Sequence, residues 1–151
     1  MILLILFLVY IVIVSFTAGD AAFGTAFKLG ATTIARVTNI SGPSLSVDTE
    51  DVTSHDSIWE EVVPTILRSG EIKLELNYDP DGVTHYATAN TGFLHAMINK
   101  TDVTTYTLVF PNGEVYSFAH AFVVGFEPAM PVGGAITGTV TIKPSGVVTV
   151  P

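Results

Sequence analysis

The chain has 151 residues, no cysteine and a formal net charge of −8, and all of its charged side chains follow residue 18. A protein that binds nucleic acid by neutralising phosphates needs an excess of lysine and arginine, so the acidic balance argues against this class. The lack of cysteine excludes disulfides and thiolate metal sites, and the length fits a single domain.

Residues 1–18 form an apolar, uncharged leader, and residues 19–151 form the predicted domain. An 18-residue helix reaches only about 27 Å, which is short for a bilayer core. The leader also lacks the basic residues that usually open a signal peptide. Three interpretations remain open: a secretory leader cut near Ala18 or Gly19, a membrane anchor, or a true start at Val12 or Val14.

The first part of the domain contains weak strand signals. Residues 23–27 and 32–40 are strand candidates separated by Leu29-Gly30-Ala31. After the turn Ser41-Gly42-Pro43, residues 44–49 alternate between polar and apolar side chains. Turn residues around short alternating runs predict antiparallel strands here.

An unusual acidic stretch follows, from Asp48 to Glu61, with six acids, no lysine or arginine, and the only tryptophan. It continues to Gly70 as a long connection, which is uncommon in a small β domain unless the connection has a function or is disordered. One interpretation is a solvated acidic loop. The other is a loop that packs on a partner, because its apolar residues need cover. The candidate contact residues are Asp48, Glu50, Asp51, Ile58, Trp59, Glu60, Glu61, Val62, Ile66 and Leu67.

The middle of the chain predicts one strand, one turn and one helix. Residues 71–78 alternate charged or amide side chains with apolar ones, so one face of this strand is expected to be buried. Asp79-Pro80-Asp81-Gly82 resembles the start of a calcium loop, but the later ligands do not follow and the residues suit an ordinary turn. Between Gly82 and Ile98 the apolar residues fall partly at helical spacing, which predicts a single helix.

Two hairpins are predicted in the last third. The first spans Thr105 to Val124 around Pro111-Asn112-Gly113, since Asn-Gly tolerates the positive φ angles of a tight hairpin turn. In the second, residues 134–143 are turned by Pro144-Ser145-Gly146 into residues 147–150. The whole pattern predicts a mainly β, antiparallel domain, a sandwich or small barrel of six or seven strands with one helix against it.

No group of residues in the sequence suggests an enzyme, and we predict no catalytic, cofactor-binding or metal-binding residues. Ser54-His55-Asp56 has the residue types of a catalytic triad, but consecutive side chains in an extended segment point apart. The histidines show no spacing typical of metal ligands, so each is expected to be structural or on the surface. They are His55, His85, His95 and His120.

Four segments, matched in order from about Gly24 to Val150, resemble the major tail tube protein of long-tailed, non-contractile bacteriophages. Residues 38–54 and 69–78 carry the first two matches. The others are Leu108-Val109-Phe110-Pro111-Asn112-Gly113 and residues 139–146. Each segment alone is weak, but four at similar spacing make the resemblance fairly specific.

The resemblance implies a tail tube fold, a β-sandwich or barrel-like domain with a flanking helix and a long early loop. Copies of the chain would form six-subunit rings, and stacked rings would form the hollow tube of the virion tail, through which DNA passes without specific binding. The long loop would contact neighbouring subunits, which would make the ten candidates above inter-subunit contacts. Other tail proteins, such as the tape measure and the terminator, are further implied partners. A negatively charged lumen would keep a polyanion from sticking.

Tail tube proteins assemble in the host cytoplasm, so an export signal would contradict this function. The resemblance therefore favours the interpretation that the true start is at Val12 or Val14, downstream of Met1, and that the chain has no membrane attachment. The main alternative is a secreted or membrane-anchored β-sandwich binding module that uses aromatics such as Trp59, Tyr86 and Tyr116. A hydrolase is a more distant alternative, and a contractile-tail or secretion-system tube protein is a near neighbour of the favoured interpretation.

Overall fold

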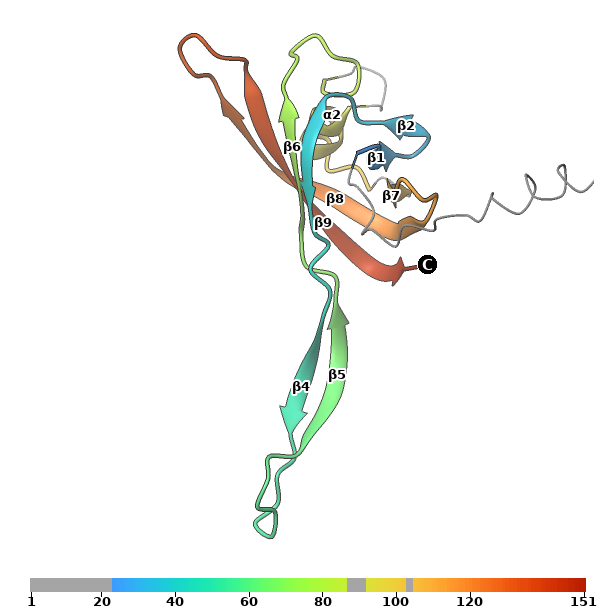
Figure 1. Cartoon of the computed structure of the whole chain (residues 1–151), viewed down its shortest axis with the longest axis vertical. Coiled ribbons are helices and arrows are strands. Elements are labelled where there is room, and N and C mark those ends of the chain that lie inside the picture. Colours follow the sequence, from blue (N-terminus) through green and yellow to red (C-terminus); the bar gives the residue numbers. More distant parts are fainter. Residues whose placement is uncertain (1–22, 87–91, 103–104) are drawn as a thin grey trace, which may run out of the picture.

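The computed structural model describes residues 23–86, 92–102 and 105–151. A curled, antiparallel, seven-stranded sheet in the order β2-β1-β7-β8-β9-β6-β3 forms the body, and a separate two-stranded sheet, β4-β5, projects from it (Figure 1). The predicted mainly β architecture is therefore confirmed. The strands are β1 (Ala26–Leu29), β2 (Thr32–Thr33), β3 (Val37–Ser41), β4 (Ser46–Asp51), β5 (Val62–Arg68), β6 (Ile72–Asn77), β7 (Tyr106–Val109), β8 (Val115–Ala129) and β9 (Thr137–Thr149).

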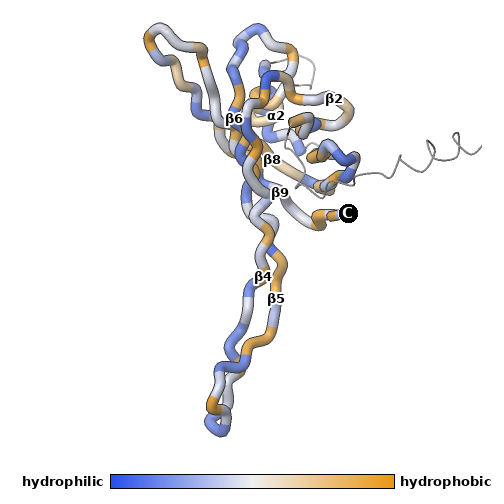
Figure 2. Tube along the Cα trace, in the orientation of Figure 1, coloured by the Kyte–Doolittle hydropathy of each residue, from blue (hydrophilic) through white to orange (hydrophobic). Residues whose placement is uncertain are grey.

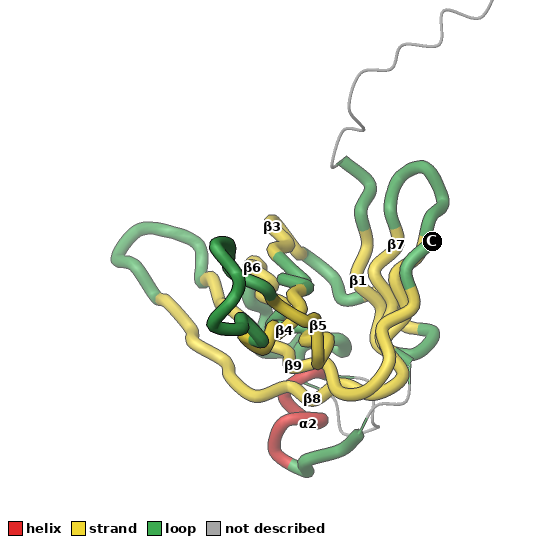
Figure 3. The backbone as a smooth tube through the Cα atoms, turned by 90° about the horizontal axis from the view of Figure 1, so that it is seen from below, coloured by secondary structure: helices red, strands yellow, loops and turns green. Residues whose placement is uncertain are grey.

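The core lies on one face of the curled sheet, under the short helix α2 (Phe93–Ile98). Seen from below, the sheet curls so that β1 and β7 turn toward the side of β3 and β6 (Figure 3). β6 alternates buried and exposed residues at every step, as its sequence predicts. The largest fully buried side chains are Tyr106, Phe27, Phe93, Phe118, Ile72, Leu74, Leu76, Ile142, His85 and Val140.

The predicted hairpin between Thr105 and Val124 is confirmed as the pair β7–β8. Gly113 has a φ of 89° and its N–H donates to the Phe110 carbonyl at 3.0 Å, while the Phe110 N–H donates to the Glu114 carbonyl at 2.9 Å. The Asn-Gly turn thus sets the register locally, as expected from its backbone freedom.

The predicted second hairpin at the C-terminal end is wrong, because β9 continues through Pro144-Ser145-Gly146 and stays paired with β8. Gly146 has a φ of 81° and sits where the register shifts, so it forms a β-bulge instead of a turn. β6 begins at Ile72 opposite Ile142, so Pro144 lies past the end of its neighbour, where a missing N–H is tolerated.

The predicted helix from Gly82 to Ile98 is also too long, since α2 contains only six residues. The N–H groups of Phe93 and Leu94 bond to the carbonyls of Thr84 and His85, so the chain folds back on itself instead of continuing one helix. Residues 87–91, inside the predicted helix, lie outside the described residues. The turn predicted before Gly82 is confirmed, because its N–H donates to the Asp79 carbonyl at 3.0 Å.

The early strands differ in their limits from the prediction. β1 includes Leu29, which was expected in the turn, and the candidate strand 32–40 is divided into β2 and β3. Arg36 lies between them with a φ of 59°, a left-handed conformation that interrupts a strand. The predicted leader, residues 1–18, lies outside the described residues. Within the described ranges, no helix has the length and apolarity needed to cross a membrane.

Candidate subunit interface

The arm, defined as residues 44–70 with β4 and β5, is the least covered part of the molecule. The long connection predicted here exists, but most of it is a two-stranded hairpin and not an irregular loop. Every residue of β5 is exposed, and apolar positions recur along it (Figure 2). An isolated two-stranded hairpin is only marginally stable in water. The arm therefore needs a partner to cover it.

Apolar side chains gather on one face of the arm. Val47 and Leu67 lie directly opposite each other in the register, so they share a face, and Leu67 is 83% exposed. Pro64 follows on that face beyond a bulge in β5, and strand alternation places Leu45 there too. This face is the natural contact surface for another protein chain.

The opposite face of the arm carries an ion pair. Arg68 donates from Nε to Oδ2 of Asp48 at 2.6 Å, and its terminal nitrogen reaches the same oxygen at 2.5 Å. The hydrogen bond from Arg68 lowers the pKa of the Asp48 carboxyl. Thr65 adds a hydrogen bond to the backbone carbonyl of Asp48 at 3.0 Å. Near the base of the arm, one face thus carries the paired charges and the other carries open apolar residues; farther along, Val63 lies opposite Glu50 on the charged side.

Short hydrogen bonds organise the tip of the arm, residues 52–61. The Thr53 N–H and hydroxyl both donate to Oδ1 of Asp51, which lowers the pKa of that carboxyl. The Glu61 N–H donates to the Thr53 hydroxyl at 2.9 Å, so the two sides of the tip are joined. This frame holds Ile58 and Trp59 in solvent, at 95% and 81% exposure.

All ten residues predicted as contacts lie on this arm; Asp48 is partly buried and the other nine are exposed. The predicted contact residues do not include further exposed apolar residues of the same arm, because the sequence predicts a short strand only at residues 44–49 and a loop from there to Gly70. Strand alternation on both sides of the tip would have identified them. They are Leu45, Val47, Val52 and Val63.

Two glycines form the neck between the arm and the body. Gly42 and Gly70 both have positive φ angles, 93° and 63°. A Cβ atom on Gly42 would overlap the carbonyl oxygen of Glu71, and one on Gly70 would overlap Ser44. The two sides of the neck thus approach so closely that only glycine fits, which fixes where the arm leaves the sheet.

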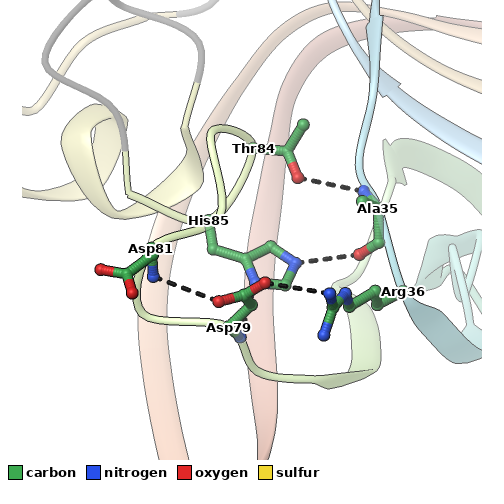
Figure 4. Close-up of polar contacts among 6 residues, drawn as sticks. All are labelled: Ala35, Arg36, Asp79, Asp81, Thr84 and His85. Carbon is green, nitrogen blue, oxygen red and sulfur yellow. Dashed lines mark hydrogen bonds and ion pairs between the residues drawn. The ribbon is translucent and has the colours of Figure 1, made fainter.

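A buried histidine ties the segment after β6 to the loop before β3 (Figure 4). Nδ1 of His85 accepts a hydrogen bond from the Asp79 N–H, and Nε2 donates to the Ala35 carbonyl, both at 2.9 Å. Thr84 accepts from the Ala35 N–H at 3.1 Å, and Arg36 pairs with Asp79 at 3.1 Å. His85 is therefore structural, as expected.

The face of the sheet turned away from the core is polar. Glu75, Thr139 and Glu127 lie in one row across β6, β9 and β8, and Lys73 and Thr141 begin the next row. The β6 residues of this face are exposed, while their neighbours along the strand are buried in the core. These polar rows are suited to water, while Phe122 and Val124 of β8 are exposed apolar residues, at 36% and 55%.

The described residues contain no cluster of three or more histidine, aspartate or glutamate side chains that could hold a metal. In the segment Ser54-His55-Asp56, the Ser54 hydroxyl lies 3.3 Å from that of Ser57, within the arm tip. The aromatics of the alternative binding module lie on separate elements: Trp59 on the arm tip, Tyr86 after β6, and Tyr116 packed edge-on against Phe110. They do not form one aromatic surface.

A sequence model of the lambda phage tail tube protein family matches residues 16–150. The fold is similar to that of a chain in the virion of a native gene transfer agent particle, with a TM-score of 0.64 and 16% identity over 84% of this chain and 95% of that chain. A search of curated protein sequences finds no match.

Chains of an extracellular contractile injection system have the same fold. A chain in the structure of its sheath/tube terminator in the extended state matches with a TM-score of 0.65 and 14% identity, over 85% of this chain and 95% of that chain. The match to its sheath-tube complex has a TM-score of 0.61 and 16% identity, over 90% and 95%. At these identities the structural similarity establishes the fold alone.

Proposed function

The chain belongs to the lambda phage tail tube protein family, a structural component of the virion tail, and on this premise we propose that its copies form six-membered rings that stack into the tail tube. The observation that carries this proposal is the arm. All of β5 is exposed, and an apolar hairpin of this kind gains its stability from a partner. In a ring or a stack, that partner is another copy of the chain.

We assign the ten predicted contact residues to the interface between copies. Their exposure in the single chain, and the apolar face beside them, support this role. The tape measure and terminator are proposed as further partners; a chain with this fold occurs in the structure of the sheath/tube terminator of a contractile injection system. The family match supports a non-contractile tail, whereas the fold by itself is shared with contractile systems.

We propose that the polar face of β6, β9 and β8 lines the channel. Glu75 and Glu127 flank Thr139 on this face and Lys73 lies in the next row, so a ring of copies would repeat two carboxylates and one ammonium group per subunit around the lumen. The excess of carboxylates would repel phosphates, and threonine hydroxyls would contact them only weakly, so DNA would slide without binding. The net charge of −8 agrees with such a channel.

The secreted binding module is the weaker candidate. It needs aromatic side chains that converge on one face, and Trp59 and Tyr116 lie on different elements, with Tyr116 packed against Phe110. Export from the cell would also not fit the tail tube family that the chain matches. We therefore propose a cytoplasmic assembly of the domain, with the leader dispensable.

Negative-stain electron microscopy of the purified chain over a range of concentrations tests the proposal. We expect hollow rings or short tubes at high concentration, with six-fold symmetry in class averages, and dissociation on dilution. A Glu75→Lys variant, imaged by cryo-electron microscopy within the tube, would locate the polar face. Monomers at every concentration, or a ring of another symmetry, would contradict the proposal.

A further inference from the structure

An apolar groove of about 370 Å³ lies at the base of the arm, where the arm meets the end of β9. Leu45 and Leu67 form its arm side, and Val147, Val148 and Val150 form its other side. Val147 is 73% exposed in the single chain. A groove of this size and lining accepts one or two large apolar side chains.

The arm tip carries side chains that suit such a groove. Ile58 and Trp59 are adjacent and almost fully exposed, and the hydrogen bonds of Thr53 and Ser57 to Asp51 and Glu61 fix the backbone around them. A tryptophan held in solvent by an ordered frame is a preorganised anchor, since little conformational entropy remains to be lost on docking.

The tip cannot reach the groove of its own arm. The two features lie at opposite ends of the hairpin, and the seven residues of β5 alone span about 23 Å at the usual rise per residue. The tip and groove of one molecule are therefore free to engage two other molecules. Such a head-to-tail contact can repeat from copy to copy. Each copy is then displaced from the previous one in the direction of the arm.

The charges around the two features are complementary. The tip is acidic, with Asp56 and Glu60 exposed beside the anchor. The groove is lined by Arg68, whose side chain is 61% exposed although it pairs with Asp48. Lys143, which pairs with Glu71 at 3.9 Å, precedes Pro144, whose carbonyl accepts a hydrogen bond from Ser69 in the groove wall. Arg68 and Lys143 each keep more than half of the side chain exposed beside the paired carboxylate, so they can still attract the acidic tip and orient it as it approaches.

A second groove, of about 500 Å³, is less suitable for the tip. It lies between β3 and the ends of β1 and β7, and its lining combines apolar side chains with the polar ones of Thr25, Thr38 and Asn39. The apolar residues are Phe23, Val37, Ile40, Leu108, Phe110 and Pro111. Docking of Trp59 there would bury polar groups of these side chains without a matching partner. The base groove is therefore the better receptor.

From these observations we infer that Trp59 and Ile58 of one copy insert into the base groove of a second copy displaced along the arm. The inference rests on the proposed function, because it specifies the contact between stacked rings. It identifies Leu67 and Val147 as the receiving residues. Because each tip would enter the base groove of the next copy, all rings in the stack would point the same way.

Disulfide cross-linking tests the contact, and the natural lack of cysteine makes the test clean. Trp59→Cys in one full-length preparation is mixed with Val147→Cys in another, at concentrations where the mixture itself forms tubes in the electron microscope. We expect a disulfide-linked dimer after mild oxidation. The matched control mixes Trp59→Cys with Val132→Cys, a fully exposed apolar position in the loop between β8 and β9. This control should give at least about tenfold less dimer.

The two proposals fail in different ways. If tubes form and the Trp59/Val147 pair does not cross-link, or the Val132 control cross-links more, the tip-to-groove contact is wrong and the tube function stands. If electron microscopy shows no assembly at all, the tube function is overturned as well. As a second variant, Val147→Asp should raise the concentration needed for tube formation by about tenfold or more, whereas Val132→Asp should change it less than about twofold.

Discussion

Gly42 lies so close to the backbone of Glu71 that a Cβ atom on the glycine would overlap the Glu71 carbonyl oxygen. Gly42 also has a φ of 93°, a conformation that residues with side chains rarely adopt. The contact closes the neck where the arm leaves the sheet, so it couples the path of the arm to the start of β6.

Substitution of Gly42 should therefore lower the free energy of unfolding more than substitution of a glycine that has a positive φ but no close neighbour. We expect Gly42→Ala to lower the free energy of unfolding by about 3 kcal/mol, from left-handed strain plus overlap. Gly113→Ala is the matched control, because its φ is 89° but nothing lies within 4 Å of its Cβ position; it should lose about 1–2 kcal/mol. Urea unfolding of the monomer, followed by circular dichroism, gives both values, and equal losses would refute the overlap.

His85→Ala should destabilise the body. The substitution removes two hydrogen bonds, leaves the Asp79 N–H and the Ala35 carbonyl without their partner, and empties a site where the side chain is only 1% exposed. We expect a loss of about 3 kcal/mol in the free energy of unfolding. His55→Ala, at an exposed position of the arm tip, should change it by less than about 0.5 kcal/mol. A His85 variant as stable as the wild type would show that the ring does not fasten these two segments.

Trp59→Ala should separate folding from assembly. The side chain is in solvent in the single chain, so its loss should leave the melting temperature of the monomer unchanged. Assembly should weaken by about 2 kcal/mol or more, the usual cost of losing an aromatic anchor. Tyr86→Ala, which also removes an exposed aromatic, is the control and should assemble normally. Sedimentation velocity at several concentrations measures this difference, and normal assembly of Trp59→Ala would exclude the anchor role.

The arm should lose its ion pair in acid. Because Arg68 lowers the pKa of Asp48 in the folded chain, the pair stabilises the arm above the ordinary carboxyl value of 3.8. This contribution should disappear as the pH falls below 3.8, through the lowered pKa. The Arg68 Nε–H resonance should shift in that pH range in an NMR titration. The pKa of Asp51 is lowered as well, but its hydrogen bonds come from Thr53 and not from Arg68. Asp48→Asn should abolish the transition of this resonance, whereas Asp81→Asn should not.

The leader should be dispensable for assembly. The family match begins at residue 16, and the predicted domain begins at residue 19. We expect a chain that starts at Ser15 to form the same rings as the full chain, in side-by-side electron micrographs at equal concentration. A truncated chain that stays monomeric, beside a full chain that assembles, would assign residues 1–14 a role in the tube.

Elements specified by local residues could be predicted from the sequence. The β7–β8 hairpin depends on Asn112-Gly113, and β6 depends on its own alternation, so neither needs information from distant residues. The turn predicted at Pro144-Ser145-Gly146 is wrong because these residues alone do not determine the structure. The same residues suit a turn and a bulge, and only pairing with β8 over the whole length of β9 decides between them.

The sequence predicts where the arm lies in the chain, but it does not predict the hairpin that the arm forms. A bulge between Val47 and Thr49 shifts the register against β5, so the apolar residues of β5 do not alternate strictly. The receiving groove could not be predicted from the sequence, because it is lined by Leu67 and Val147, which are 80 positions apart in the chain. The role of His85 was similarly hidden, since its partner Ala35 lies 50 residues earlier.

The marginal stability of a lone two-stranded arm also bears on when the tube forms. Two free monomers that meet form one tip-to-groove contact and leave most of both arms exposed, so spontaneous nucleation should be rare. At an existing end, the tips and grooves of a whole ring are already in place, so each added subunit covers its arm with several contacts at once. Growth should therefore show a lag phase that preformed ends abolish, which confines polymerisation to the site where the first ring is built.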